Sequence, residues 1–302
     1  MVLPNFLIFG VQKAGTTSIY SYLEQHPQVY TSPRKETDFF CRDLTVPLSE
    51  EEPRLTRGGR KRILTIEDYK SLFLGVTDEI AIGEASPNYL FRHENAVAGI
   101  QKYVPEAKLI AILRNPVERA YSDYLMHVRQ VVGNRKPLAQ QVAESAQSSH
   151  TLLKGRYYEG IKHFLDVFGS NQVKIFLYDD LRKDSTGLMR QVYEFIGVDP
   201  DFEVDTGRKQ QTAQVPKNQS IHQLLQTKNP VRQFAGSMLR KVMPEEKRQK
   251  LRSRLIAANS TGKDGLPLSA EDRQLLEDYY RDDVRQLQDL LDCDLSRWFS
   301  LD

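Results

Sequence analysis

The chain has 302 residues, of which 40% are hydrophobic and 27% are charged, an ordinary composition for a globular protein. This composition excludes a wholly disordered chain, a collagen and a coiled coil. The 42 Lys and Arg residues nearly balance the 40 Asp and Glu residues, so no global basic excess favours nucleic acid as a partner. Cys41 and Cys293 are too few for a disulfide framework, and we expect both thiols to be reduced.

The N-terminal segment carries no targeting signal. It lacks a basic region, and its apolar stretch is too short for a signal peptide. No apolar run in the chain approaches the ~18 residues that a transmembrane helix needs. We therefore expect a cytoplasmic protein of bacterial type, or a catalytic domain taken from a larger protein.

Short apolar runs alternate with helical patterns over the first 200 residues. The runs predict buried strands at Phe6–Gly10, Ile80–Gly83, Lys108–Leu113 and Val173–Tyr178. Helices are predicted at Thr16–Gln25, Thr65–Leu74, Asn95–Tyr103, from Pro116 onward and at Tyr157–Phe168. Residues 42–62 are polar and contain a Gly58-Gly59 pair, which predicts a loop. The alternation predicts an α/β fold with a central parallel sheet flanked by helices. Ligands bind beyond the carboxyl ends of the strands in such folds.

The C-terminal third has a different pattern. Strand signals stop at about residue 217, and residues 217–263 hold eleven Lys and Arg residues against only Glu245 and Glu246. This basic stretch fits helices with a solvated face, a docking surface for an anionic acceptor or an acyl carrier protein, or a peripheral membrane contact. Glu271–Leu291 predicts an amphipathic helix whose stripe packs on the core, formed by Leu275, Leu276, Tyr279, Leu287 and Leu291. We expect a single domain over residues 1–302, with an α/β core at about 1–200 and a helical region at about 201–302.

The first strand runs into a candidate phosphate cradle, Gly10–Thr17. Two glycines five residues apart precede two hydroxyl residues that open a helix, so backbone N–H groups and the positive helix end would hold an anion there. The pattern is similar to a P-loop, but Thr16 stands where a P-loop has its Lys, and a lysine lies inside the loop at Lys13. Phosphate binding is thus favoured over ATP hydrolysis.

A second motif, Leu113–Ser122, lies at the end of the clearest strand and the start of the next helix. Arg114 offers a planar fork of donors and Ser122 offers a hydroxyl, which together suit a second phosphate.

Taken in order, these motifs resemble the sulfotransferases that use 3′-phosphoadenosine 5′-phosphosulfate (PAPS), in particular the heparan-sulfate-type branch and its bacterial relatives. Residues 12–17 resemble that family's 5′-phosphosulfate loop, and residues 113–122 resemble its 3′-phosphate element. Three further segments also match: Pro33–Phe40 the "KE…FF" segment, Gly83–Tyr89 the segment that carries a catalytic acidic residue, and Gly155–Tyr157 the start of a later helix.

The resemblance implies PAPS as donor, 3′-phosphoadenosine 5′-phosphate (PAP) as product, and no metal. It implies a donor site made by Gln12, Lys13, Ala14, Gly15, Thr16, Thr17, Arg114, Ser122, Tyr157 and Lys217. Residues 207–209 are the alternative to Lys217 as the basic loop that covers the 3′-phosphate. Lys13 is expected to neutralise the leaving phosphate, with Lys35 as a second cation. Glu84 is the expected general base, and Glu36 is a weaker rival that orients Lys35 or contacts the acceptor.

The acceptor stays open between several classes. A sugar hydroxyl or amine is the first expectation, and a hydroxyacyl chain on a carrier protein, as in polyketide synthases, is the second. Small-molecule and lipid hydroxyls are further alternatives. Two readings from other classes are a P-loop kinase, which would require Mg²⁺, and a binding module that holds PAP without transfer.

Overall fold

The computed structural model describes residues 2–49, 53–55, 61–130, 135–207, 215–216, 260–261 and 267–299. Its contacts divide the chain into two compact units. The first comprises residues 1–116, 156–209 and 281–302, and the second comprises residues 117–155 and 210–280.

A five-stranded sheet is the centre of the first unit. Its strands are β1 (Phe6–Gly10), β2 (Val29–Thr31), β3 (Ala81–Ala85), β4 (Lys108–Leu113) and β5 (Val173–Leu177). They run in the order β2-β3-β1-β4-β5, and every neighbouring pair is parallel. All residues of β1 and β3 are buried, as expected for strands covered on both faces. The predicted parallel α/β sheet is confirmed.

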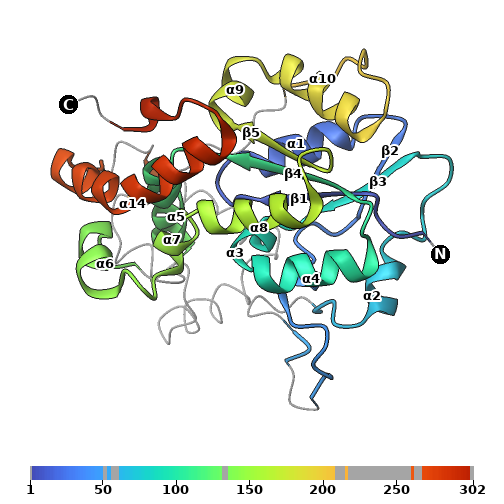
Figure 1. Cartoon of the computed structure of the whole chain (residues 1–302), viewed down its shortest axis with the longest axis horizontal. Helices are drawn as coiled ribbons and strands as arrows, with labels where there is room; N and C mark the ends of the chain where they lie inside the picture. Colours follow the sequence, from blue (N-terminus) through green and yellow to red (C-terminus); the bar gives the residue numbers. More distant parts are fainter. Residues whose placement is uncertain are drawn as a thin grey trace, which may run out of the picture. The chain divides into compact units, whose positions relative to one another are not determined.

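Helices cover both faces of this sheet. In Figure 1, α1 (Thr16–Leu23), α9 (Tyr178–Lys183) and α10 (Ser185–Ile196) lie on one side. On the other side lie α3 (Asn88–Phe91), α4 (His93–Tyr103) and α8 (Tyr158–Phe168). The first unit also holds α2 (Ile66–Ser71) and two 3-10 turns, η1 (Phe39–Cys41) and η3 (Ser296–Trp298). Apolar side chains fill the space between layers, and the rings of Phe9 and Phe164 stack with centroids 4.1 Å apart.

The second unit contains α6 (Leu138–Ser145), α7 (His150–Leu153) and a two-residue antiparallel pair, β6 (Val215–Pro216) with β7 (Ser260–Thr261). Two long helices belong to both units: α5 (Pro116–Gln130) and α14 (Ala270–Leu291). Pro116 begins α5, as predicted.

Several expectations need correction. Tyr178 was expected to end a strand, but it begins α9. Strand β7 lies in the region where no strand was expected. The buried stripe of α14 runs through Leu276, Tyr280, Val284 and Leu287, a regular three- to four-residue spacing that leaves Leu275 38% exposed. Most of the basic stretch 217–263 lies outside the described residues.

Candidate active site

The carboxyl ends of four neighbouring strands meet at one edge of the sheet, because all strands are parallel. Loop Gly10–Thr17 follows β1, Ser86 follows β3, Arg114 follows β4 and Tyr178 follows β5. The two motifs singled out by sequence thus emerge from adjacent strands, β1 and β4.

Loop Gly10–Thr17 has the backbone of an anion cradle. Gly15 stands at the N-cap of α1 with a φ of 93°, a conformation that glycine adopts without steric cost. A side chain there would also meet Leu181 at 2.7 Å, so no other residue fits. No side chain caps α1, which leaves the N–H groups of its first turn directed at the loop. Lys13, with a φ of 71°, adds a cation.

A second lysine reaches the cradle from another segment. The Lys35 amine donates a hydrogen bond of 2.5 Å to the Thr17 hydroxyl. The same amine lies 3.8 Å from the Glu36 carboxylate, and the two side chains are 21% and 45% exposed. Burial lowers the pKa of Lys35, and the nearby Glu36 charge opposes this effect. Lys35, Glu36 and the loop therefore form one polar cluster.

Arg114 joins the second motif to the first. Its guanidinium donates to the Lys13 carbonyl at 2.9 Å and lies 4.8 Å from the centre of the Tyr178 ring. Tyr157 is fully buried, and its hydroxyl donates to the Arg114 carbonyl at 2.9 Å. Tyr157 therefore holds Arg114 in place, although it was expected among the donor-binding residues. Tyr178 stacks on Arg114 and was not predicted; its position directly after a strand was the available signal.

The only tryptophan packs behind this motif. The Asn115 amide donates to the Trp298 carbonyl at 2.5 Å, and the Trp298 indole N–H donates to Asp179 at 3.3 Å. The Tyr157 ring meets the indole edge-on, with centroids 6.4 Å apart. Trp298 of η3, bonded to Asp179 of α9, thereby fixes the backbone at Asn115, directly after Arg114.

Ser122 lies on α5, in the second compact unit, and is 8% exposed. Three residues before it, the fully buried Arg119 donates to the Thr151 carbonyl and lies 3.7 Å from Asp123. These contacts fix α5 against α7. Lys217, Arg208 and Lys209, the expected basic residues over the 3′-phosphate, lie outside the described residues.

Glu84 is completely buried in β3. Tyr89 donates to its Oε1 at 2.6 Å, Tyr69 donates to the same oxygen at 3.3 Å, and Ser86 donates to Oε2 at 2.8 Å. Burial raises the pKa of Glu84 to about 7, against the effect of these hydrogen bonds. The raised pKa suits a general base, whereas the 0% exposure leaves the side chain no surface open to an acceptor in this structure. The role of Glu84 as a general base stays a prediction.

Within the described residues, no group of three or more His, Cys, Asp or Glu side chains is placed to hold a metal ion. In the same part of the chain, no helix combines the length and the apolar character needed to cross a bilayer.

Comparisons with known proteins agree with these features. A family profile described as "Sulfotransferase domain" matches residues 3–259. The mouse bifunctional heparan sulfate N-deacetylase/N-sulfotransferase 4 is 28% identical over 305 residues, which cover 96% of this chain and 30% of that protein. Mouse carbohydrate sulfotransferase 15 is 28% identical over 254 residues, which cover 66% of this chain and 44% of that protein. The chain therefore spans less than half the length of either relative.

Among solved structures, a sulfotransferase from Alicyclobacillus acidocaldarius is 28% identical with a TM-score of 0.69, and the match covers 99% of both chains. The family profile, the relatives and this structure confirm the resemblance drawn from the motifs: the chain belongs to the sulfotransferase domain family.

Proposed function

We propose that this protein transfers a sulfuryl group from PAPS to a hydroxyl or amine of an acceptor. The observation that carries the proposal is the hydrogen bond from Arg114 to the Lys13 carbonyl. It joins two cationic elements at one sheet edge, and PAPS carries two separate anionic groups, a 5′-phosphosulfate and a 3′-phosphate. A nucleotide triphosphate would require only the first element.

The residues fit this donor. Loop residues 12–17 would hold the 5′-phosphosulfate through backbone N–H groups, at a glycine that leaves no room for a side chain. Arg114 would hold the 3′-phosphate. The part of Ser122 in that site stays a prediction. PAPS supplies the sulfuryl group when bound. Lys13 and Lys35 then offset the charge that develops on the leaving phosphate and the transferring group, so catalysis rests on positioning and electrostatics.

The acceptor must lose a proton, and two carboxylates compete for it. Glu36 is 45% exposed and lies 3.8 Å from Lys35, whose amine binds the phosphate loop. Glu84 is fully enclosed. Direct contact with an acceptor favours Glu36 as the general base, which reverses the order expected from the sequence.

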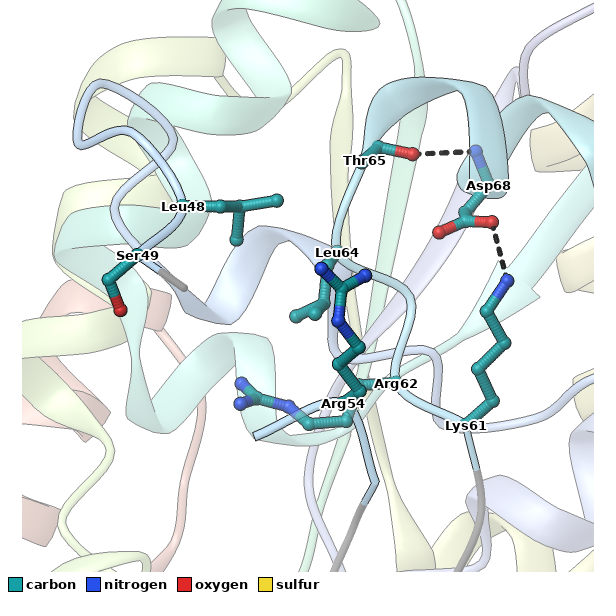
Figure 2. Close-up of a pocket in the computed structure, with 8 residues that line it drawn as sticks. All are labelled: Leu48, Ser49, Arg54, Lys61, Arg62, Leu64, Thr65 and Asp68. Carbon is teal, nitrogen blue, oxygen red and sulfur yellow. Dashed lines mark hydrogen bonds and ion pairs between the residues drawn. The ribbon is translucent and has the colours of Figure 1, made fainter. Parts of the chain in front are cut away.

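A carbohydrate is the proposed acceptor. The names of the relatives refer to heparan sulfate and to carbohydrate. A pocket with a basic rim supports an anionic carbohydrate in particular (Figure 2). It is lined by Leu48, Ser49, Arg54, Lys61, Arg62, Leu64, Thr65 and Asp68. Arg54 and Arg62 lie on neighbouring backbone segments, with the Arg62 N–H donating to the Arg54 carbonyl at 2.8 Å. The Arg62 guanidinium donates to the Pro53 carbonyl at 3.3 Å, and both arginines line the pocket.

On the other side of this pocket, Lys61 lies 3.0 Å from Asp68, and Thr65 accepts from the Asp68 N–H at 3.0 Å (Figure 2). An adjoining cavity of about 370 Å³ is lined by Phe39, Tyr103 and apolar residues of 44–48. Aromatic walls suit the faces of sugar rings. The alternative acceptor, a hydroxyacyl chain on a carrier protein, would dock on residues 217–263, most of which lie outside the described residues. Cytoplasmic placement stays a prediction.

Calorimetry with PAP tests the donor, and ATP with Mg²⁺ is the comparison. Tight, metal-independent binding of PAP supports the proposal, whereas preference for ATP with Mg²⁺ would favour the kinase alternative. Transfer of labelled sulfate from PAPS to desulfated and sulfated glycans then tests the acceptor. PAP binding without transfer to any glycan, carrier-bound or small-molecule acceptor would favour the binding module. An increase in acceptor KM for Arg54→Ala on sulfated glycans only would support the basic pocket as an acceptor subsite.

A further inference from the structure

Glu84 is the centre of a buried cluster of hydroxyl groups that the proposed chemistry does not use. The hydroxyl cluster comprises Tyr69, Tyr89, Ser86 and Thr37 around the Glu84 carboxylate. Each of these five side chains belongs to a residue that is at most 4% exposed. The Thr37 hydroxyl extends the cluster beyond the groups that contact the carboxylate. Its Oγ1 lies 3.1 Å from Tyr89 Oη and 3.3 Å from Ser86 Oγ.

The hydroxyl cluster holds the backbone that follows Lys35 and Glu36. Ser86 Oγ accepts the Asp38 N–H at 3.0 Å, and Thr37 Oγ1 accepts the Phe39 N–H at 3.3 Å. The Glu36 N–H donates to the carbonyl of Ala85, the residue between Glu84 and Ser86, at 2.8 Å. Glu36 and Asp38 are thus bonded directly to the end of β3, and Phe39 is bonded to Thr37, whose hydroxyl lies 3.3 Å from Ser86 Oγ.

This turn needs such support because its backbone is strained. Glu36 and Asp38 have φ values of 59° and 52°, in the left-handed region that costs energy for residues with a side chain. Strained positions of this kind persist only where surrounding contacts determine them, and they gather at functional sites. The turn also sets where the Lys35 amine and the Glu36 carboxylate point.

In its ionised form, Glu84 determines the direction of the side-chain hydrogen bonds that reach its carboxylate. An ionised carboxylate only accepts, so the protons of Tyr69, Tyr89 and Ser86 all point to it. Ser86 Oγ is then left with lone pairs for the Asp38 N–H, and Tyr89 Oη is left to accept from Thr37. A glutamine would place an NH₂ donor on one side and reverse one of these bonds.

We propose that Glu84 is a positioning residue: through the hydroxyl cluster, its carboxylate fixes the turn 36–39 and so aims Lys35 and Glu36 at the phosphate loop. Among the described residues no cation pairs with Glu84, and a buried carboxylate without a cation costs more than a neutral side chain would. What the Glu84 carboxylate provides in return is a fixed direction for the hydrogen bonds that surround it. The inference rests on the proposed sulfuryl transfer.

Four single variants test the role: Glu84→Gln, Ser86→Ala, Glu36→Gln and, as a matched control, the exposed Glu106→Gln. Positioning predicts that Glu84→Gln and Ser86→Ala each lower kcat by about 10- to 100-fold, since small misplacements of reacting groups have effects of this size. KM for the donor and PAP affinity stay within twofold. The kcat of the Glu84→Gln/Ser86→Ala double variant falls no further than that of the worse single variant, because both substitutions act through one network. Glu106→Gln stays at the wild-type rate.

Amide exchange separates positioning from proton transfer. Glu84→Gln speeds exchange of the Asp38 amide, whereas Glu36→Gln loses turnover and leaves that exchange rate at the wild-type value. An unchanged Asp38 exchange rate in Glu84→Gln, or a kcat equal to wild type, would overturn the proposal. If the wild type transfers no sulfate, the proposed function is wrong. Amide exchange then still tests whether the hydroxyl cluster holds the turn 36–39. Ser86→Ala should speed exchange of the Asp38 amide by at least tenfold, and an unchanged rate there refutes the cluster's hold on the turn.

Discussion

Replacing Glu84 with Gln should shift the free energy of unfolding in favour of the variant as pH rises from 4.5 to 7. The folded protein raises the pKa of Glu84 from an ordinary value of 4.5 to about 7, because burial disfavours the ionised form. Between these pH values the unfolded chain has lost the proton while the folded chain keeps it, so the free energy of unfolding falls as pH rises. Each pH unit corresponds to about 1.4 kcal/mol, which gives a loss of about 3 kcal/mol from this group by pH 7.

The assay is urea unfolding of wild type and Glu84→Gln at intervals from pH 4.5 to 8.5, followed by far-ultraviolet circular dichroism. Other ionisable groups are common to both proteins, so the difference in unfolding free energy isolates Glu84. That difference should move in favour of the Gln variant by about 3 kcal/mol between pH 4.5 and 7 and then level off. A pH-independent difference, or one that favours wild type as pH rises, would refute the assignment of a buried, cation-free carboxylate. Glu106→Gln should show no such trend.

Three further variants test the donor site. Lys13→Ala should lower kcat by about 100- to 1,000-fold, because the leaving phosphate loses its cation; a rate near wild type contradicts this role. Arg114→Ala should weaken PAP binding by at least tenfold in calorimetry, since a charged hydrogen bond contributes about 1.5–3 kcal/mol, with no change in acceptor KM; unchanged PAP affinity removes Arg114 from the 3′-phosphate site. Gly15→Ala should lower stability by more than about 1 kcal/mol in urea and also weaken PAP binding, because its φ is 93° and its Cβ would meet Leu181 at 2.7 Å; a fully stable variant would show that the cradle tolerates a side chain.

The sequence predicted the elements whose signal is local. Lys108–Leu113 is an uninterrupted apolar run, and β4 has the same bounds. Pro116 marked the start of α5 because proline suits the first turn of a helix. Strand β2 was missed, since Val29–Thr31 is a three-residue strand at the sheet edge with one buried position and no repeating pattern. The loop Gly10–Thr17 between β1 and α1 was predictable because its glycines, hydroxyls and Lys13 are contiguous; phosphate binding by this loop stays a prediction.

The environment of Glu84 was not predictable in the same way. Its chemical role depends on Tyr69, which arrives from α2, and on Thr37, which arrives from the segment before β3. No spacing in the sequence specifies that these hydroxyls converge, so the motif indicated the carboxylate without the hydroxyl groups that surround it. The exposure of Glu36 and the position of its carboxylate beside the Lys35 amine were also not predictable. Both depend on a left-handed turn at residues for which the sequence contains no glycine signal.

Trp298 gives the protein a built-in optical probe. It is the single tryptophan of the chain, and its carbonyl and indole are bonded to Asn115 and Asp179, on the elements that follow Arg114 and Tyr178. All tryptophan emission therefore originates from the wall behind the proposed 3′-phosphate site. Titration with unlabelled PAP can then be followed by fluorescence, and a spectral change that is lost in Arg114→Ala would localise the occupied subsite without a crystal.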